Sequence, residues 1–152
     1  MKLSTKGRYA TTALVDLTLN GEDRLVTLLE ISERQKISLP YLEQLFVKLR
    51  RSGIVASVRG PLGGYRIARK PELIRISEVM YAVDESMDAI SRGGGASGGD
   101  TGSIAEIMSE KLWEQLSANV YVFLHQTRLS DLVNDQLTPC PAVPSFIKMV
   151  DE

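Results

Sequence analysis

The sequence contains very little cysteine and histidine. Cys140 and His125 are the only examples of each among its 152 residues. A single thiol cannot form a disulfide within the chain, and a single imidazole cannot build a metal cage or pair with a second catalytic histidine. We therefore expect that the protein is not an enzyme.

Long apolar runs are also missing. No stretch approaches the roughly 20 consecutive apolar residues that a membrane-spanning helix needs, and residues 1–6 lack the apolar run of a signal peptide. We expect a cytoplasmic protein with no membrane partner. Hydrophobic residues make up 43% of the chain and charged residues 24%, which is typical of one globular domain.

The net charge of -1 conceals an uneven distribution. Residues 1–80 hold 14 Lys and Arg against 8 Asp and Glu, a balance of +6, while residues 81–152 hold 4 against 11, a balance of -7. A basic half suits the phosphate backbone of a nucleic acid. A solvated charged surface has the same composition, so charge alone leaves both interpretations open.

Apolar periodicity and capping residues predict most of the helices. Thr27 and Glu30 have the spacing of a capping box, and Ser38 can cap a following helix in which Pro40 occupies an early position. The first helix is expected to have an apolar face formed by Tyr9, Leu14, Leu17 and Leu19 with the small residues Ala10 and Ala13. The helices are expected over residues 4–20, 28–35, 38–52, 77–84 and, as the longest, 104–134.

Residues 54–59 and 65–68 are rich in β-forming side chains and are joined by the glycine-rich segment 60–64, which predicts a β-hairpin. Three short helices followed by a hairpin are the element order of a winged helix-turn-helix. The expected fold is therefore mainly α with a small β-hairpin. The expected domains are a winged helix-turn-helix over 1–84, a glycine-rich loop over 85–103, a dimerisation helix over 104–136 and an irregular tail over 137–152.

In a winged helix-turn-helix, the second helix of the pair reads base edges and the wing follows the backbone or enters a minor groove. Gln44 can bond to adenine, Glu43 can accept from cytosine, and Arg59 suits a narrow minor groove. Phosphate contacts are expected from Lys6, Arg8, Lys48, Arg51 and Arg66. The complete predicted interface consists of Lys6, Arg8, Ser38, Pro40, Tyr41, Glu43, Gln44, Lys48, Arg51, Arg59, Gly60, Pro61, Gly63, Tyr65 and Arg66.

The long helix carries an apolar seam that one small winged domain cannot cover. We expect the seam to pack on a second copy of the chain, which predicts a homodimer and a two-fold symmetric DNA operator. The seam residues are Met108, Leu112, Leu116, Val120 and Phe123.

Several segments resemble the family of IscR-like iron–sulfur cluster regulators. The likeness is clearest at 3–10, 31–35, 41–46 and 58–65, and it continues through 83–86, 112–113 and 129–134. It implies a homodimeric transcription factor that represses cluster-assembly genes, while related regulators respond to other iron or cysteine signals. Pro40 departs from the family, which often has a hydroxyl-bearing residue there.

The resemblance also implies a [2Fe-2S] cluster, held in the family by three cysteines spaced Cys-x5-Cys-x5-Cys and a fourth ligand. In this chain Ser91, Ser97 and Ser103 occupy that spacing. A hydroxyl has a far higher pKa than a thiol and offers iron no soft anionic ligand, so we expect no cluster here, although a cysteine-containing parent would hold one. The spacing can be chance, an engineered replacement or a natural loss of ligands.

Two residues are candidates for a fourth ligand. Glu106 stands at the family's place, and His125 is the alternative further along the helix. Each also has an ordinary role, Glu106 as a first-turn carboxylate and His125 as a helical surface residue. Cys140 lies in the proline-rich tail and is expected to be incidental.

Two other functions are consistent with parts of the sequence. One is a related regulator that senses another iron or cysteine-metabolism signal. The other is an iron–sulfur carrier or interaction protein with a vestigial helix-turn-helix. A carrier needs neither a charged recognition helix nor a glycine-tipped wing, and it would show no salt-dependent DNA binding.

Overall fold

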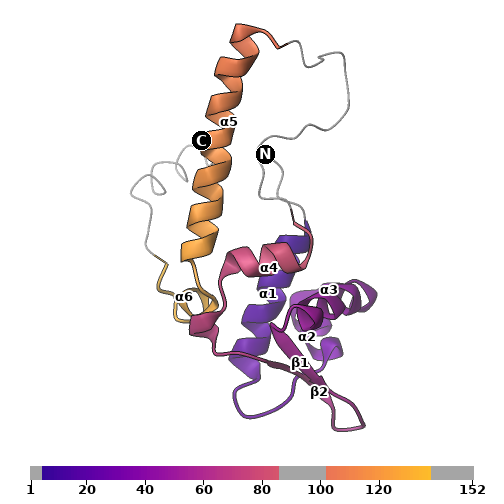
Figure 1. Cartoon of the computed structure of the whole chain (residues 1–152). Coiled ribbons are helices and arrows are strands. Elements are labelled where there is room, and N and C mark those ends of the chain that lie inside the picture. Colours follow the sequence, from indigo (N-terminus) through magenta and orange to yellow (C-terminus); the bar gives the residue numbers. More distant parts are fainter. Residues whose placement is uncertain (1–4, 86–101, 138–152) are drawn as a thin grey trace, which may run out of the picture.

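The computed structural model describes residues 5–85 and 102–137, so residues 86–101 and the tail from 138 lie outside it. Figure 1 shows a helical domain with a two-stranded hairpin projecting from one side and a long helix extending away from it. The elements are α1 (Thr5–Asn20), α2 (Leu28–Gln35), α3 (Leu39–Arg51), β1 (Val55–Val58), β2 (Gly64–Ile67), the 3-10 helix η1 (Pro71–Leu73), α4 (Ile76–Ala82), α5 (Ile104–Gln126) and α6 (Leu129–Val133). The expected winged helix-turn-helix fold is confirmed.

The ends of α2 and α3 follow directly from local sequence. The amide of Thr27 donates to the Glu30 carboxylate at 2.8 Å, and the amide of Glu30 donates to the Thr27 hydroxyl at 3.2 Å. This reciprocal pair is the predicted capping box. Lys36 ends α2 in the left-handed conformation at φ 57°, and the Ser38 hydroxyl accepts from the amide of Tyr41 at 3.4 Å.

The core lies where α1, α2, α3, α4 and the hairpin meet. Leu14, Leu42 and Phe46 are fully buried there. The apolar face predicted for α1 is wrong at two positions, because Tyr9 is 40% exposed and Leu19 is 59% exposed. The rest of the predicted face is confirmed, because Ala10, Ala13, Leu14 and Leu17 are buried. Leu19 lies on the opposite side of the helix from Ala10, as nine residues at 3.6 per turn dictate.

The hairpin is attached to the helix-turn-helix through Tyr65. β1 and β2 pair antiparallel, with Val58 opposite Gly64. The backbone of Tyr65 exchanges two hydrogen bonds with Val26, at 3.0 and 2.7 Å, just ahead of α2. Its ring meets the ring of buried Phe46 edge-on, with centroids 5.0 Å apart. The wing is therefore anchored both to the chain before α2 and to the buried face of α3.

The continuous helix predicted over 104–134 is wrong. α5 ends at Gln126, and Thr127 and Arg128 are extended before α6 begins. The carbonyl of Thr127 accepts from the amide of Ile76 at 2.9 Å, and the amide of Leu129 donates to the carbonyl of Ile74 at 2.9 Å. Backbone groups that bond to a neighbouring segment cannot also continue a helix.

Beyond this break, the chain returns to the winged domain. Leu129 on α6 is fully buried within its core. By contrast, α5 buries none of its residues against the described chain and is about 35 Å long at 1.5 Å per residue. Within the described residues, no helix is both long and apolar enough to cross a membrane.

Candidate nucleic-acid interface

Helix α3 presents a polar face to solvent because its apolar stripe is fixed in the core. Leu45 and Leu49 are buried, whereas Glu43, Gln44 and Arg51 are exposed. Within the described residues, the side chains of these three make no hydrogen bond or ion pair. Their donors and acceptors therefore remain available to base edges and phosphates.

The wing supplies two further exposed cations beside α3. Arg59 follows directly after β1, and Arg66 lies on β2 opposite Ala56. Neither guanidinium forms an ion pair with any residue of the described chain. Gly60, which follows Arg59, is exposed and adopts φ +118°, a conformation that suits glycine. Figure 1 shows this hairpin extending outward below α3.

Lys48, a predicted phosphate contact, is paired with a carboxylate of its own chain. Its ammonium lies 2.7 Å from a carboxylate oxygen of Asp84, two residues after the end of α4. The hydrogen bond and the charge of Lys48 hold the pKa of Asp84 below its ordinary value. A DNA phosphate must therefore share Lys48 with Asp84 or displace it.

The next residue, Glu85, anchors the start of α1. Its carboxylate accepts from the amide of Gly7 at 2.8 Å and is buried. A Cβ at Gly7 would lie 2.5 Å from the sulfur of Met80, so glycine permits this close approach. Asp84 and Glu85 thus connect the end of α4 to α3 and to α1, just ahead of residues 86–101.

Two tyrosines of the predicted interface have structural partners. Tyr41 is half-buried, its ring meets Tyr9 edge-on with centroids 5.7 Å apart, and its hydroxyl lies 3.5 Å from that of Thr5. Tyr65 packs against Phe46 as described above. These contacts explain why both positions are aromatic without any DNA contact.

The remaining interface positions belong to the start of α1, the start of α3 and the turn of the wing. Pro40 and Arg8 are exposed, Lys6 is half-buried, and the Ser38 hydroxyl is engaged as the α3 cap. Pro61 is exposed in the turn of the wing. The fold therefore gathers the predicted residues from the start of α1, from α3 and from the wing.

The sequence interpretation overlooked apolar side chains on this surface. Val47 is 36% exposed on α3, three residues after Gln44, and Leu62 is 93% exposed in the wing turn. A search restricted to polar and charged residues could not find them. A helical-wheel plot places Val47 beside Gln44 and Arg51, and that pattern was the available signal for Val47.

A second missed feature is a buried carboxylate where α1 meets α2. The Asp16 side chain is only 1% exposed and accepts two hydrogen bonds from Arg34, at 2.7 and 3.0 Å, and one from Gln35 at 2.7 Å. Burial alone raises the pKa of Asp16, but the hydrogen bonds from Arg34 and Gln35 outweigh it, so the net shift is downward. The signal was an acidic residue between Leu14 and Leu17 on an apolar face.

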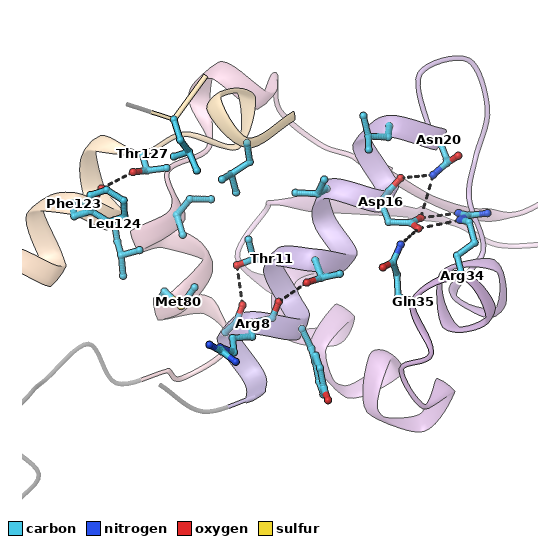
Figure 2. A pocket seen from close by; sticks show the side chains of 18 residues that line it. Arg8, Thr11, Asp16, Asn20, Arg34, Gln35, Met80, Phe123, Leu124 and Thr127 are labelled. Atoms are coloured by element: carbon cyan, nitrogen blue, oxygen red, sulfur yellow. Dashed lines mark hydrogen bonds and ion pairs between the residues drawn. The ribbon is translucent and has the colours of Figure 1, made fainter. Parts of the chain in front are cut away.

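Figure 2 shows this cluster at one end of a groove along α1. The groove has a volume of about 890 Å³ and is lined mainly by apolar side chains. Met80, Phe123 and Leu124 line it from α4 and α5. It therefore lies between the helix-turn-helix and the base of the long helix.

The three predicted cluster-ligand positions are only partly described. Ser91 and Ser97 lie outside the described residues. Ser103 is the cap of α5, and its hydroxyl accepts from the amide of Glu106 at 3.2 Å. Three hydroxyl groups and one carboxylate offer no thiolate, so this donor set does not fit a [2Fe-2S] cluster.

His125 cannot join Glu106 within one chain. The two residues are 19 positions apart on α5, or about 28 Å along the helix axis. The ring nitrogen Nδ1 of His125 lies 3.1 Å from the hydroxyl of Ser77, and the ring stacks on Tyr121. The described ranges, 5–85 and 102–137, contain no group of three His, Cys, Asp or Glu residues placed to hold a metal ion.

Comparison with known families settles the class of protein. The model of the Rrf2 family, described as an iron-dependent transcriptional regulator, matches residues 3–135. The chain belongs to the Rrf2 family. As an Rrf2 member it is a DNA-binding transcriptional regulator and not an enzyme.

Individual Rrf2 proteins support the same assignment. The HTH-type transcriptional regulator IscR of Cereibacter sphaeroides is 62% identical over 154 residues, covering 100% of this chain and 99% of that protein. The structure of T. potens IscR has a TM-score of 0.69 at 31% identity and covers 92% and 94% of the two chains. CymR, the global cysteine regulator of B. subtilis, has a TM-score of 0.72 at 28% identity and covers 90% and 99%.

Proposed function

We propose that the protein binds a two-fold symmetric operator as a homodimer in the cytoplasm and represses iron–sulfur cluster assembly genes. The observation that carries the proposal is the outward face of α3, where Glu43 and Gln44 are exposed without intramolecular partners beside the cations of the wing. The similarity to the IscR of Cereibacter sphaeroides at 62% identity supports the choice of target genes.

Each part of the interface has a distinct task in this proposal. Gln44 bonds to an adenine edge, Glu43 accepts from a cytosine amino group, and Arg59 enters the minor groove. Arg8, Arg51 and Arg66 contact phosphates, which adds affinity without sequence information. These cations are exposed on the elements that surround the α3 face.

The proposed dimer interface is the seam of α5. Met108, Leu112 and Phe123 are 66%, 62% and 57% exposed, and Leu116 and Val120 are half-buried. An apolar strip of this size on a projecting helix is typical of a protein–protein contact. Pairing two α5 helices places two recognition helices on one DNA duplex, which sets the separation of the operator half-sites.

The proposed regulator works without the three-thiolate cluster that the family resemblance implies. Serine at the three positions leaves iron no thiolate in this loop, and the cap role of Ser103 uses its hydroxyl for α5. The similarity to CymR supports a second candidate function, the regulation of cysteine metabolism. The location of the operator distinguishes the two candidates, since each regulator would bind operators upstream of its own class of genes.

The DNA-binding proposal is tested by selecting duplexes from a random-sequence pool with the purified protein. We expect one enriched, two-fold symmetric sequence. Gln44→Ala should cost about 1–3 kcal/mol on that duplex and little on random DNA, whereas Arg51→Ala should weaken both and reduce the salt slope by about one. Equal losses on both duplexes for Gln44→Ala would contradict base readout.

The cluster proposal is tested by reconstitution with iron and sulfide. We expect no visible absorption from the protein, and a coloured [2Fe-2S] form once cysteine is placed at Ser91, Ser97 and Ser103 together. A Cys140→Ser variant is the control, because Cys140 is the only thiol in the chain. If the unmodified protein is coloured and the Cys140→Ser variant is not, iron binds at the tail and the proposal is overturned.

A further inference from the structure

The wing carries an apolar side chain at its most exposed point. Leu62 is 93% exposed, more than any other large hydrophobic residue of the described chain. It lies in the turn between β1 and β2, which Figure 1 shows projecting away from the helical domain. Nothing in the described fold covers it.

The turn holds Leu62 in a defined position. The amide of Gly63 donates to the carbonyl of Gly60 at 2.9 Å, which closes a four-residue turn with Pro61 and Leu62 at its centre. Proline fixes its own φ angle at the position where such turns favour it. A Cβ on Gly63 would lie 2.1 Å from the carbonyl oxygen of Val58, so the turn is packed tightly against the end of β1.

A rigid turn lowers the entropy cost of burying its side chain in a complex. Leucine loses little rotamer freedom on burial, and the backbone around Leu62 is already ordered by the closed turn. The usual cost of ordering a loop on binding is therefore small here. Most of the free energy gained by removing the leucine side chain from water can then contribute to binding of a partner.

The neighbouring charges identify DNA as the partner. Arg59 is three residues before Leu62, is exposed, and has no ion-pair partner among the residues that the structure describes. Arg66 on β2 adds a second exposed cation to the same hairpin. A cation beside an apolar tip matches the minor groove, where arginine meets the negative potential and apolar side chains contact sugars and base steps.

We infer that Leu62 is an apolar minor-groove contact of the wing, in a position next to Arg59. The inference rests on the proposed DNA-binding function and assigns part of its affinity to a residue that neither reads a base by hydrogen bonding nor neutralises a phosphate. Leu62 therefore strengthens binding without adding to its salt dependence, because no counterion is released when an apolar side chain is buried.

The test uses the duplex that the parent protein selects from a random-sequence pool and measures affinity by fluorescence anisotropy between 50 and 300 mM KCl, about the range in which such slopes are read. Leu62→Ser should weaken binding by about five- to thirtyfold with an unchanged salt slope. Arg59→Ala should weaken binding and also flatten the slope. Leu62→Met should restore most of the affinity, since it replaces one apolar side chain by another of similar volume.

The control is Leu29→Ser, because Leu29 is also exposed, at 54%, but lies on α2 rather than on the wing. It should leave affinity unchanged. Parent-like binding by Leu62→Ser would overturn the inference while leaving the proposed function intact. Failure of the parent to enrich any duplex would overturn the proposed function itself, so the two failures are distinguishable. A loss that Leu62→Met does not restore would also count against an apolar contact.

Discussion

The ammonium of Lys48 on α3 lies 2.7 Å from the carboxylate of Asp84, a residue 36 positions later in the chain. Both side chains are partly exposed, so the pair itself adds little to stability. Its importance lies in its location, because it places a negative charge against a cation on the helix that we propose to face DNA. Any ligand that competes for Lys48 must displace or accommodate Asp84.

Replacing Asp84 by asparagine should tighten binding to all DNA sequences. The substitution removes the competing carboxylate and leaves Lys48 available to a phosphate, so the salt slope should steepen by about one unit. Anisotropy titrations on random duplexes at several KCl concentrations measure both quantities. In a Lys48→Ala background, Asp84→Asn should have much less effect on either. An equal gain in that background would show that Asp84 acts on DNA without Lys48.

Replacing Arg34 by alanine should destabilise the protein by about 1–3 kcal/mol, because it leaves the buried Asp16 carboxylate with fewer hydrogen-bond donors. The matched control is Arg24→Ala, whose ion pair with Glu30 is half exposed and should cost under about 1 kcal/mol. Urea unfolding at one fixed protomer concentration measures both. If the two variants lose similar amounts of unfolding free energy, the burial of Asp16 adds nothing to the strength of its ion pair.

The same ion pair predicts a pH dependence. The pKa of Asp16 is lowered in the folded state, so its contribution to stability is complete above the unfolded pKa of about 3.9 and is lost as the pH falls through the folded value. The stability difference between the parent and an Asp16→Asn variant should therefore shrink as the pH falls from 5 to 3, in about that window. A difference that stays constant across this range would exclude the linkage.

Replacing Leu129 by alanine should cost about 2–5 kcal/mol, because this side chain is fully buried in the winged-domain core although it lies on α6. Leu137→Ala is the control, since Leu137 is 44% exposed and should change stability by less than about 0.5 kcal/mol. A fragment ending at residue 84 should be correspondingly unstable. If that fragment unfolds as the full chain does, the first domain is independent of α6.

Replacing Leu112 by glutamate should dissociate the proposed dimer. The substitution puts a charge into the α5 seam, where Leu112 is 62% exposed in one chain, so the isolated chain should remain folded. Sedimentation at micromolar concentration should give a species near 34 kDa for the parent and near 17 kDa for the variant, about twice and once the chain mass of 16.8 kDa. Glu114→Gln on the same helix is the control and should leave the dimer unchanged.

The features that sequence predicted well are local ones. The start of α2 follows from Thr27 and Glu30, which are three residues apart, and the cap of α3 follows from Ser38. The end of α5 was missed because it depends on hydrogen bonds between Thr127 and Ile76, 51 residues apart, which no periodicity reports. Helix propensity within 104–134 favoured continuation, and tertiary pairing overrode it.

The candidate site shows the same division. The exposure of Gln44 could be predicted, because the buried stripe on α3 fixes which face points outward. The pairing of Lys48 with Asp84 and the clustering of Arg34 around Asp16 could not, because each joins two elements whose relative position only the folded core determines. The apolar tip at Leu62 was overlooked because leucine is not a residue type that marks DNA contacts.

The two extended residues between α5 and α6 act as a joint for the whole molecule. The carbonyl of Thr127 accepts from the amide of Ile76 at the start of α4, and the amide of Leu129 donates to the carbonyl of Ile74. Between them, the Arg128 guanidinium donates to the carbonyl of Glu72 at 3.1 Å. These bonds, together with the contact between Ser77 on α4 and His125 near the end of α5, set the direction in which α5 leaves the winged domain. In a dimer held by α5, a small rotation at this joint is multiplied by the length of the helix. If the proposed dimer forms through α5, the distance between its two α3 helices, and with it the spacing of the operator, depends on residues far from the proposed DNA contacts.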